Sequence, residues 1–277
     1  MQLLRAVAAI YFVLNKIDFN KFIDKIFHID LVYLALAFLA FNASKVLSAF
    51  RLNYFFRALG LSLQENYNLK LYYLGMLYNQ VFPGGIGGDG YKVYLLNKLN
   101  KTTIKGLLAA TLIDRISGVV ALAFLSLLAS LQSDNILALF GGYSFLIWIA
   151  LILCYPAYYI LVHYIFPTYK KYNHITNIQA LGVQGLQVLC IWLLMNGIAL
   201  HADVFDYFTL FLVSSVAAAL PISAPGGVGI REYVMLEGAL LLKLDESGAV
   251  ALASLFFIIS FLSALFGLFF MRTFKSN

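Results

Sequence analysis

One stretch of the sequence decides the fold: Val81-Phe82-Pro83-Gly84-Gly85-Ile86-Gly87-Gly88-Asp89-Gly90-Tyr91. It interrupts an otherwise apolar segment over residues 69–96. A helix does not run unbroken through this stretch, because proline lacks the backbone donor and glycine is a poor helix former. Non-helical backbone at membrane depth is tolerated only where protein or a wet cavity surrounds it. We therefore expect a helix, a break and a second helix that dip into a membrane and return.

A second stretch has the same character: Ala224-Pro225-Gly226-Gly227-Val228-Gly229-Ile230-Arg231-Glu232-Tyr233, inside the apolar segment 207–242. The prolines of the two motifs are 142 positions apart, and a tyrosine follows six residues after Gly85 and after Gly227. Three spans separate the motifs, so the second unit enters the membrane upside down. Inverted repeats around broken helices are typical of secondary transporters. We expect one domain, 1–277, with repeats over about 29–131 and 175–272 and a connecting span over about 143–166.

The composition requires a membrane. The chain is 62% hydrophobic and 12% charged, whereas a soluble domain has about 25% charged residues. A transmembrane helix needs about 20 apolar residues, and six segments are candidates: 2–14, 31–50, 106–131, 143–166, 175–200 and 248–271. The first is short and could instead be a signal peptide, but it lacks a small-residue cleavage site. We expect an all-α integral membrane protein with about six transmembrane helices and two re-entrant hairpins.

Charge and cysteine usage exclude other classes. The net charge is +6, but the basic residues lie at the ends of apolar segments instead of forming the stripe that nucleic acid needs. The two cysteines, Cys154 and Cys190, both lie in apolar segments and have no metal-ligand spacing. We expect no nucleic-acid partner, no metal and no cofactor.

The loops that we expect in the cytoplasm are basic. Their basic residues are Lys92, Lys98, Lys101, Lys105, Lys170, Lys171, Arg272 and Lys275. The intervening loops carry acidic residues, namely Asp134, Asp203 and Asp206. This alternation places both termini in the cytoplasm of a multi-pass protein of the cell's inner membrane. Lys16, Lys21 and Lys25 fall on the outside and count against the scheme.

The glycines suggest an anion site. Gly85-Ile-Gly87-Gly-Asp-Gly90 formally matches a dinucleotide fingerprint, but that motif needs a βαβ unit, and the flanks here are membrane segments. Glycines do leave backbone N–H groups uncovered, and a helix that begins after them directs its positive end at the break. We expect the glycines over 84–88 and 226–229, Gly87 and Gly229 above all, to offer such donors to an anionic headgroup. The alternative is that the glycines only allow close helix packing.

Asp114 and Arg115 lie inside the third span, where each costs about 2.5–3.5 kcal/mol. Adjacent residues on a helix do not face each other, so each should pair elsewhere, for example with Arg231, Glu232, Asp89 or Lys92. The alternatives are a structural ion pair or a position near the membrane surface. Lys45, Arg51 and Arg57 are most simply interfacial residues, and Glu237 is a weaker candidate for proton coupling.

The predicted substrate site therefore lies between the two motifs and is lined by the third span. It comprises Pro83, Gly84, Gly85, Gly87, Gly88, Asp89, Lys92, Asp114, Arg115, Pro225, Gly226, Gly227, Gly229, Arg231 and Glu232. Arg115, Arg231 and Lys92 would neutralise the headgroup. We predict no catalytic residue.

At these motifs the chain resembles the lysylphosphatidylglycerol synthase transmembrane region, or flippase-like domain. The resemblance rests on five stretches: Phe56-Arg57-Ala58-Leu59-Gly60, residues 79–89, Tyr91-Lys92-Val93-Tyr94-Leu95-Leu96, Asp114-Arg115-Ile116-Ser117-Gly118, and residues 220–232. Family members often have Glu-Arg in place of Asp114-Arg115. The synthase proper adds a soluble aminoacyltransferase domain. Since the sequence ends five residues after Arg272, we expect no tRNA-dependent transferase activity.

The resemblance implies transport of an anionic, aminoacylated or polyprenyl-linked lipid across the cytoplasmic membrane. We therefore expect a lipid flippase, not an enzyme, with a membrane lipid as its substrate. Two alternatives stay open. One is a membrane partner of a separate soluble lipid-modifying transferase. The other is an intramembrane enzyme with Asp89, Asp114 or Glu232 as acid or base.

Overall fold

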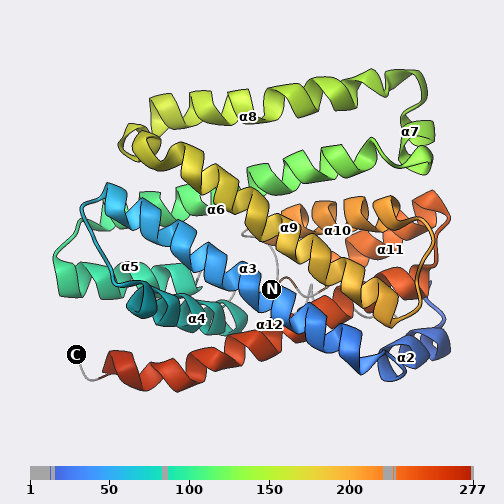
Figure 1. Cartoon of the computed structure of the whole chain (residues 1–277), viewed down its shortest axis with the longest axis horizontal. Coiled ribbons are helices and arrows are strands. Elements are labelled where there is room, and N and C mark those ends of the chain that lie inside the picture. The colour runs from blue at the N-terminus through green and yellow to red at the C-terminus, as the bar shows by residue number, and fades with distance from the viewer. Residues whose placement is uncertain (1–12, 14–15, 83–86, 221–226, 228, 276–277) are drawn as a thin grey trace.

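The computed structural model describes residues 13, 16–82, 87–220, 227 and 229–275. Within these ranges all regular structure is helical (Figure 1). The α-helices are α2 (Phe19–Phe27), α3 (Leu31–Ala58), α4 (Glu65–Val81), α5 (Gly87–Asn100), α6 (Ile104–Ser130), α7 (Asp134–Phe140), α8 (Phe145–Ile165), α9 (Asn173–Gly197), α10 (Val204–Ala219), α11 (Ile230–Leu242) and α12 (Glu246–Lys275). Two 3-10 segments, η2 (Gly141–Tyr143) and η3 (Pro167–Tyr172), join α7 to α8 and α8 to α9.

Five helical stretches are long and apolar enough to cross a membrane. They are Leu31–Ala58, Ile104–Ser130, Phe145–Ile165, Pro167–Gly197 and Glu246–Arg272. These match five of the six predicted spans, and the chain is an all-α, multi-pass membrane protein. The predicted first span, 2–14, lies outside the described residues except for Val13. The α3 helix continues to Ala58, beyond the predicted boundary at 50.

Both broken segments fold as hairpins, as predicted. The α4 and α5 helices pack against each other, and so do α10 and α11. The motif residues Pro83, Gly84, Gly85, Pro225 and Gly226 lie outside the described residues. At the second break Gly227 has φ +77° and Gly229 has φ +83°. Residues with a Cβ rarely adopt this left-handed region, so the backbone there requires glycine.

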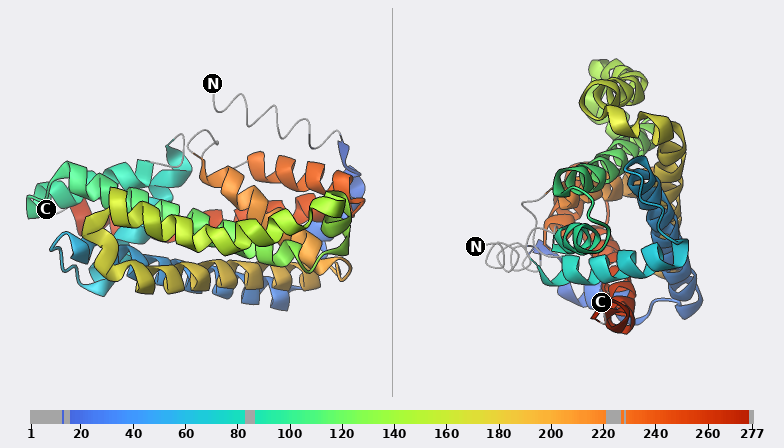
Figure 2. Two further views of the ribbon diagram at one scale, coloured as in Figure 1. Left: turned by 90° about the horizontal axis from the view of Figure 1, so that it is seen from above. Right: turned by 90° about the vertical axis from the view of Figure 1, so that its left-hand side faces the viewer.

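The two hairpins enter from opposite ends of the bundle. The α4–α5 hairpin opens toward the end where α3 finishes, and the α10–α11 hairpin opens toward the end where α9 finishes (Figure 1). The first helix of each hairpin packs on the last span of the other half, α4 on α12 and α10 on α6. The helices also correspond at the offset of the motifs: α3 matches α9, and α6 matches α12. The two halves therefore run in opposite directions and pack on each other, and the long helices lie roughly along one axis of the bundle (Figure 2).

Two glycines allow the helices of the first hairpin, α4 and α5, to pack closely. A Cβ on Gly88 of α5 would overlap the Gly75 carbonyl oxygen and lie 2.8 Å from the Gly75 Cα. A Cβ on Gly75 would overlap Cε of Lys92. Gly88 also donates its N–H to Asn79 Oδ1 at 2.8 Å. The α4 and α5 backbones therefore approach more closely than any larger residue allows.

Gly88→Ala is expected to destabilise the protein by about 1–3 kcal/mol, the usual cost of overpacking against atoms that cannot move aside. Gly90→Ala, on the same helix, is the control, because a Cβ at Gly90 meets nothing within 4 Å. Thermal unfolding in detergent measures both. Equal melting temperatures for the two variants would contradict the close packing.

The two ends of the bundle differ in charge. At one end of the bundle, basic residues lie at the C-terminal ends of α3, α5 and α12 and at the N-terminal ends of α6 and α9. They include Arg57, Lys98, Lys105 and Lys171. At the other end, each of the three lysines that oppose the predicted orientation has a carboxylate partner: Lys16 has Glu237, Lys21 has Asp18 and Lys25 has Asp245. Lys243, at the end of α11, lies at the same end, so four lysines count against that orientation.

A cysteine at Asn100, introduced after Cys154 and Cys190 have been replaced, is expected to resist a membrane-impermeant thiol reagent in intact cells. It should react once the cells are opened, because the positive-inside rule places the basic loop in the cytoplasm. A cysteine at Asn135 should behave in the opposite way. Labelling at Asn100 in intact cells would invert the topology.

Candidate functional site

A polar face of α3 marks the site. Along α3, Phe41 belongs to one buried apolar cluster and Leu52 to another. Lys45, Ser48 and Arg51 lie between them at spacings of three residues, which places them on neighbouring positions of one helix face. All three line a cavity. The site therefore lies between the two buried apolar clusters.

Two adjoining cavities form at this level, with volumes of about 310 and 290 Å³. Both are lined by α3, α4, α6, α9 and α10; α5 lines only the first, and Gly227 and α11 line only the second. Residues common to both include Lys45, Tyr72, Asn79, Arg115 and Gln187. Each volume is near the lower end of the range for small-ligand sites. Both halves of the inverted arrangement therefore contribute to one polar space.

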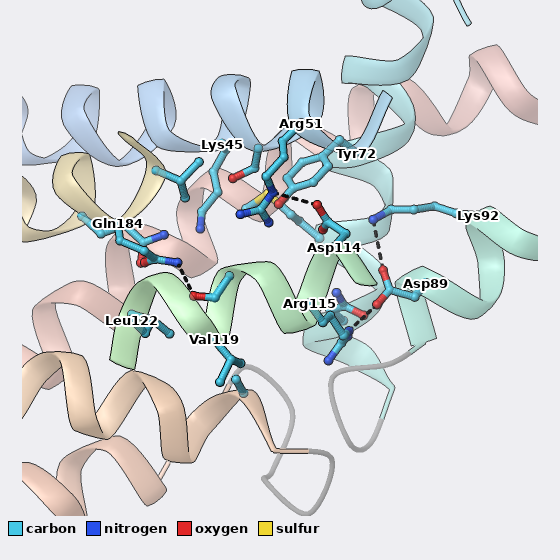
Figure 3. Close-up of a pocket in the computed structure, with 17 residues that line it drawn as sticks. Lys45, Arg51, Tyr72, Asp89, Lys92, Asp114, Arg115, Val119, Leu122 and Gln184 are labelled. Atoms are coloured by element: carbon cyan, nitrogen blue, oxygen red, sulfur yellow. Dashed lines mark hydrogen bonds and ion pairs between the residues drawn. The ribbon is translucent and has the colours of Figure 1, made fainter. Parts of the chain in front are cut away.

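Asp114 of α6 pairs with Arg51 of α3 in the first cavity (Figure 3). Arg51 Nε donates to Asp114 Oδ1 at 2.8 Å. The two side chains are 6% and 13% exposed, so the pair has little contact with solvent. The Arg51 NH1 atom is buried without a hydrogen-bond partner among the described residues. The sequence predicted that Asp114 pairs with a residue elsewhere, such as Arg231 or Lys92, but its partner is Arg51.

Asp89 joins two cations from different helices (Figure 3). Its Oδ2 accepts from Arg115 Nε at 2.6 Å, and its Oδ1 accepts from Lys92 Nζ at 3.1 Å. Lys92 Nζ also lies 4.7 Å from the centre of the Tyr72 ring. Asp89 therefore ties the first hairpin to α6, and it neutralises part of the charge of both Lys92 and Arg115.

The second cavity has cations without carboxylates. Of its described lining residues, Lys45, Arg115 and Arg231 are basic and none is acidic. Lys45 Nζ lies 4.4 Å from the centre of the Phe41 ring. The Arg231 guanidinium lies 4.6 Å from the centre of the Phe256 ring, and its Nε is buried without a hydrogen-bond partner within the described ranges. Aromatic rings orient these two cations but do not neutralise them.

Glu232 does not line either cavity. It is buried, and its carboxylate accepts the backbone N–H of Gly229 at 2.8 Å. The expectation that Gly229 leaves its N–H uncovered is therefore wrong, because a capping box at the start of α11 uses that donor. A glutamate three residues after the break is the sequence signal for such a box.

The other predicted glycines also differ in their surroundings. Gly227 lines the second cavity. The prediction that Gly88 offers its N–H to a substrate is wrong, because Gly88 is buried and donates its N–H to Asn79 Oδ1. Gly87 lies against Phe82, whose ring a Cβ at this position would overlap. Of the glycines that the structure describes at the two breaks, only Gly227 lines a cavity.

The sequence predicts Lys45 and Arg51 as snorkelling or interfacial residues, and both predictions are wrong, because both side chains line a polar cavity. Arg51 forms the buried pair with Asp114, and Lys45 lines both cavities from the middle of α3. Arg57 does lie near a helix end, where it pairs with Glu65. Glu237 pairs with Lys16 and is 38% exposed, so it lies away from the cavities. The spacing of Lys45, Ser48 and Arg51 was the signal for a polar helix face.

Further polar residues of the site come from α9. Gln184 and Gln187 are buried and line both cavities, and Gln184 Nε2 donates to the Gly118 carbonyl at 3.4 Å. Over the described part of the chain, no three side chains of His, Cys, Asp or Glu lie close enough together to hold a metal ion. The site therefore consists of paired charges, two cations without carboxylates, and amide and hydroxyl groups.

The family model described as the lysylphosphatidylglycerol synthase TM region matches residues 1–267. No curated protein matches the chain. The match covers the helices of both halves, α12 as far as residue 267, and every described residue of the two cavities.

Proposed function

Since the chain belongs to the family of the lysylphosphatidylglycerol synthase transmembrane region, a membrane protein family with a lipid-related role, we propose that it is a lipid transporter of the flippase type. Its substrate is an anionic, aminoacylated or polyprenyl-linked lipid, which it moves across the cytoplasmic membrane. We propose no catalytic step. A separate soluble transferase that supplies the lipid stays a predicted partner.

The observation that carries this proposal is the polar space between the inverted hairpins. Five basic and two acidic side chains line the two cavities, namely Lys45, Arg51, Lys92, Arg115, Arg231, Asp89 and Asp114. A charge at the centre of a membrane helix costs about 2.5–3.5 kcal/mol by insertion scales. Such charges persist at substrate pathways, and an anionic headgroup would balance the positive excess.

The arrangement of helices supports movement as well as binding. Each hairpin packs on the last span of the other half, so displacement of one hairpin displaces a wall of the shared cavity. Rocking of one repeat against the other around a fixed site is the usual form of alternating access. We propose that the hairpins open the cavity alternately to the two faces of the membrane.

Headgroup-accessibility mapping in cells tests the proposal. An impermeant reagent reports the lipids of the outer leaflet in cells with and without the protein. We expect the leaflet distribution of at least one anionic or aminoacylated lipid class to change, and an Arg231→Gln copy not to restore it. Identical distributions of every class in the two strains would overturn the proposal.

A further inference from the structure

The seven charged side chains of the site divide into two sets. Arg51, Lys92 and Arg115 each have a carboxylate partner within 3.1 Å. Lys45 and Arg231 have none within 4.0 Å among the residues that the structure describes. The carboxylates Asp89 and Asp114 line the first cavity, whereas the described lining of the second contains no acid.

Arg231 is placed where a cation is unfavourable. It lies in the first turn of α11, where the helix dipole is positive. The neighbouring Glu232 is occupied by the Gly229 N–H. The ring of Phe256 fixes the guanidinium, and the buried Nε has no partner within the described ranges. Glu232 offsets part of this charge from a distance, but no described carboxylate lies within 4.0 Å of the guanidinium.

The rest of the second cavity offers hydrogen-bond donors beside these cations. Ser215 Oγ is buried without a partner in the described part of the chain and lines the cavity. Gln187 lines it from α9 and is buried. Hydroxyl and amide groups donate to an anion, and guanidinium and ammonium groups form charge-assisted hydrogen bonds to phosphate oxygens.

We infer that Lys45 and Arg231 form a binding subsite for a phosphate group, with Ser215 and Gln187 as neutral donors, while the ion-paired set around Asp89 and Asp114 is the scaffold that positions it. This inference rests on the proposed function and narrows the substrate to one that presents a phosphate. It also removes Arg115 and Lys92 from the headgroup-neutralising set that the sequence predicted. The subsite joins α3 of the first half to α11 of the second.

Binding of two probes to the purified full chain in a non-ionic detergent tests the subsite. The probes are dihexanoylphosphatidylglycerol, which carries a lipid phosphodiester, and inorganic phosphate. We expect saturable binding of at least one probe to the wild type. Loss of one charge-assisted contact, about 1.5–3 kcal/mol, corresponds to a tenfold or larger rise in Kd for Lys45→Gln and for Arg231→Gln. Lys105→Gln, which removes an exposed lysine at the basic end, should bind as the wild type does.

Two further measurements keep the result interpretable. Lys45→Arg keeps the charge, and its Kd for the probes should lie within a few-fold of the wild-type value. Melting temperatures of Lys45→Gln and Arg231→Gln equal to that of the wild type exclude loss of folding as the cause of weaker binding. If only the lipid probe binds, the phosphate belongs to a lipid. If both bind and compete, the subsite accepts the group from either source.

The subsite and the transporter proposal fail in different ways. Unchanged Kd values in Lys45→Gln and Arg231→Gln, or no binding of either probe to the wild type, would overturn the subsite even if the protein moves lipid. Binding by the wild type without any lipid movement would overturn the transporter and leave the subsite.

Discussion

Asp114→Asn is expected to destabilise the folded protein by about 3–5 kcal/mol, because it leaves the buried Arg51 without its counter-charge. Arg51 is 6% exposed at the side chain and bonds to Asp114 at 2.8 Å. Its NH1 atom has no hydrogen-bond partner among the described residues. In the Asp114→Asn variant, few polar groups would therefore remain to stabilise the Arg51 guanidinium. Unfolding in detergent by a graded denaturant measures the free energy.

Two controls separate this ion pair from a general effect of losing a carboxylate. Glu237→Gln breaks a pair with Lys16 in which both side chains are more than a third exposed, and it should cost at most about 1 kcal/mol. The double variant Arg51→Met, Asp114→Leu removes both charges and should recover most of the lost stability. An Asp114→Asn protein that unfolds like the wild type would show that the pair does not hold α3 to α6.

Arg231→Gln is expected to lower the rate of lipid transport about ten- to a hundredfold without preventing membrane insertion. The estimate corresponds to the loss of one charge-assisted hydrogen bond, about 1.5–3 kcal/mol. Folding should tolerate the change, because Arg231 has no carboxylate partner within 4.0 Å among the described residues and the buried Glu232 keeps its hydrogen bond from the Gly229 N–H.

The matched control is Arg272→Gln, which removes an exposed arginine near the end of α12 and should leave transport unchanged. Arg231→Lys keeps the charge but not the planar fork, so it should retain part of the rate. Transport by Arg231→Gln at the wild-type rate would assign Arg231 a structural role only.

The sequence predicted the architecture because its signals are local. A run of about 20 apolar residues or a proline followed by glycines has the same meaning wherever it occurs. The helices on either side of the two breaks begin and end close to where these signals place them. The close contact between Gly75 and Gly88 is different, because it depends on how α4 and α5 lean together.

The partners within the site could not be predicted in the same way. Arg51 and Asp114 are 63 positions apart, and their meeting depends on which helix faces which. The predicted span ended at residue 50, whereas α3 continues to Ala58. That shorter boundary moved Arg51 to the membrane surface. Asp89 is among the predicted partners of Asp114 and Arg115, because the sequence assigns all three residues to one site.

Translocation of a fluorescent anionic phospholipid in proteoliposomes tests the central claim most directly. A label on the acyl chain leaves the headgroup intact, and an impermeant quencher reports the outer leaflet. Lipid transport predicts that the quenchable fraction changes with the amount of wild-type protein, under an imposed ion gradient if coupling requires one, and that Arg231→Gln liposomes resemble protein-free ones. Wild-type liposomes that match protein-free ones for phosphatidylglycerol, its aminoacylated form and a polyprenyl phosphate alike would contradict the claim.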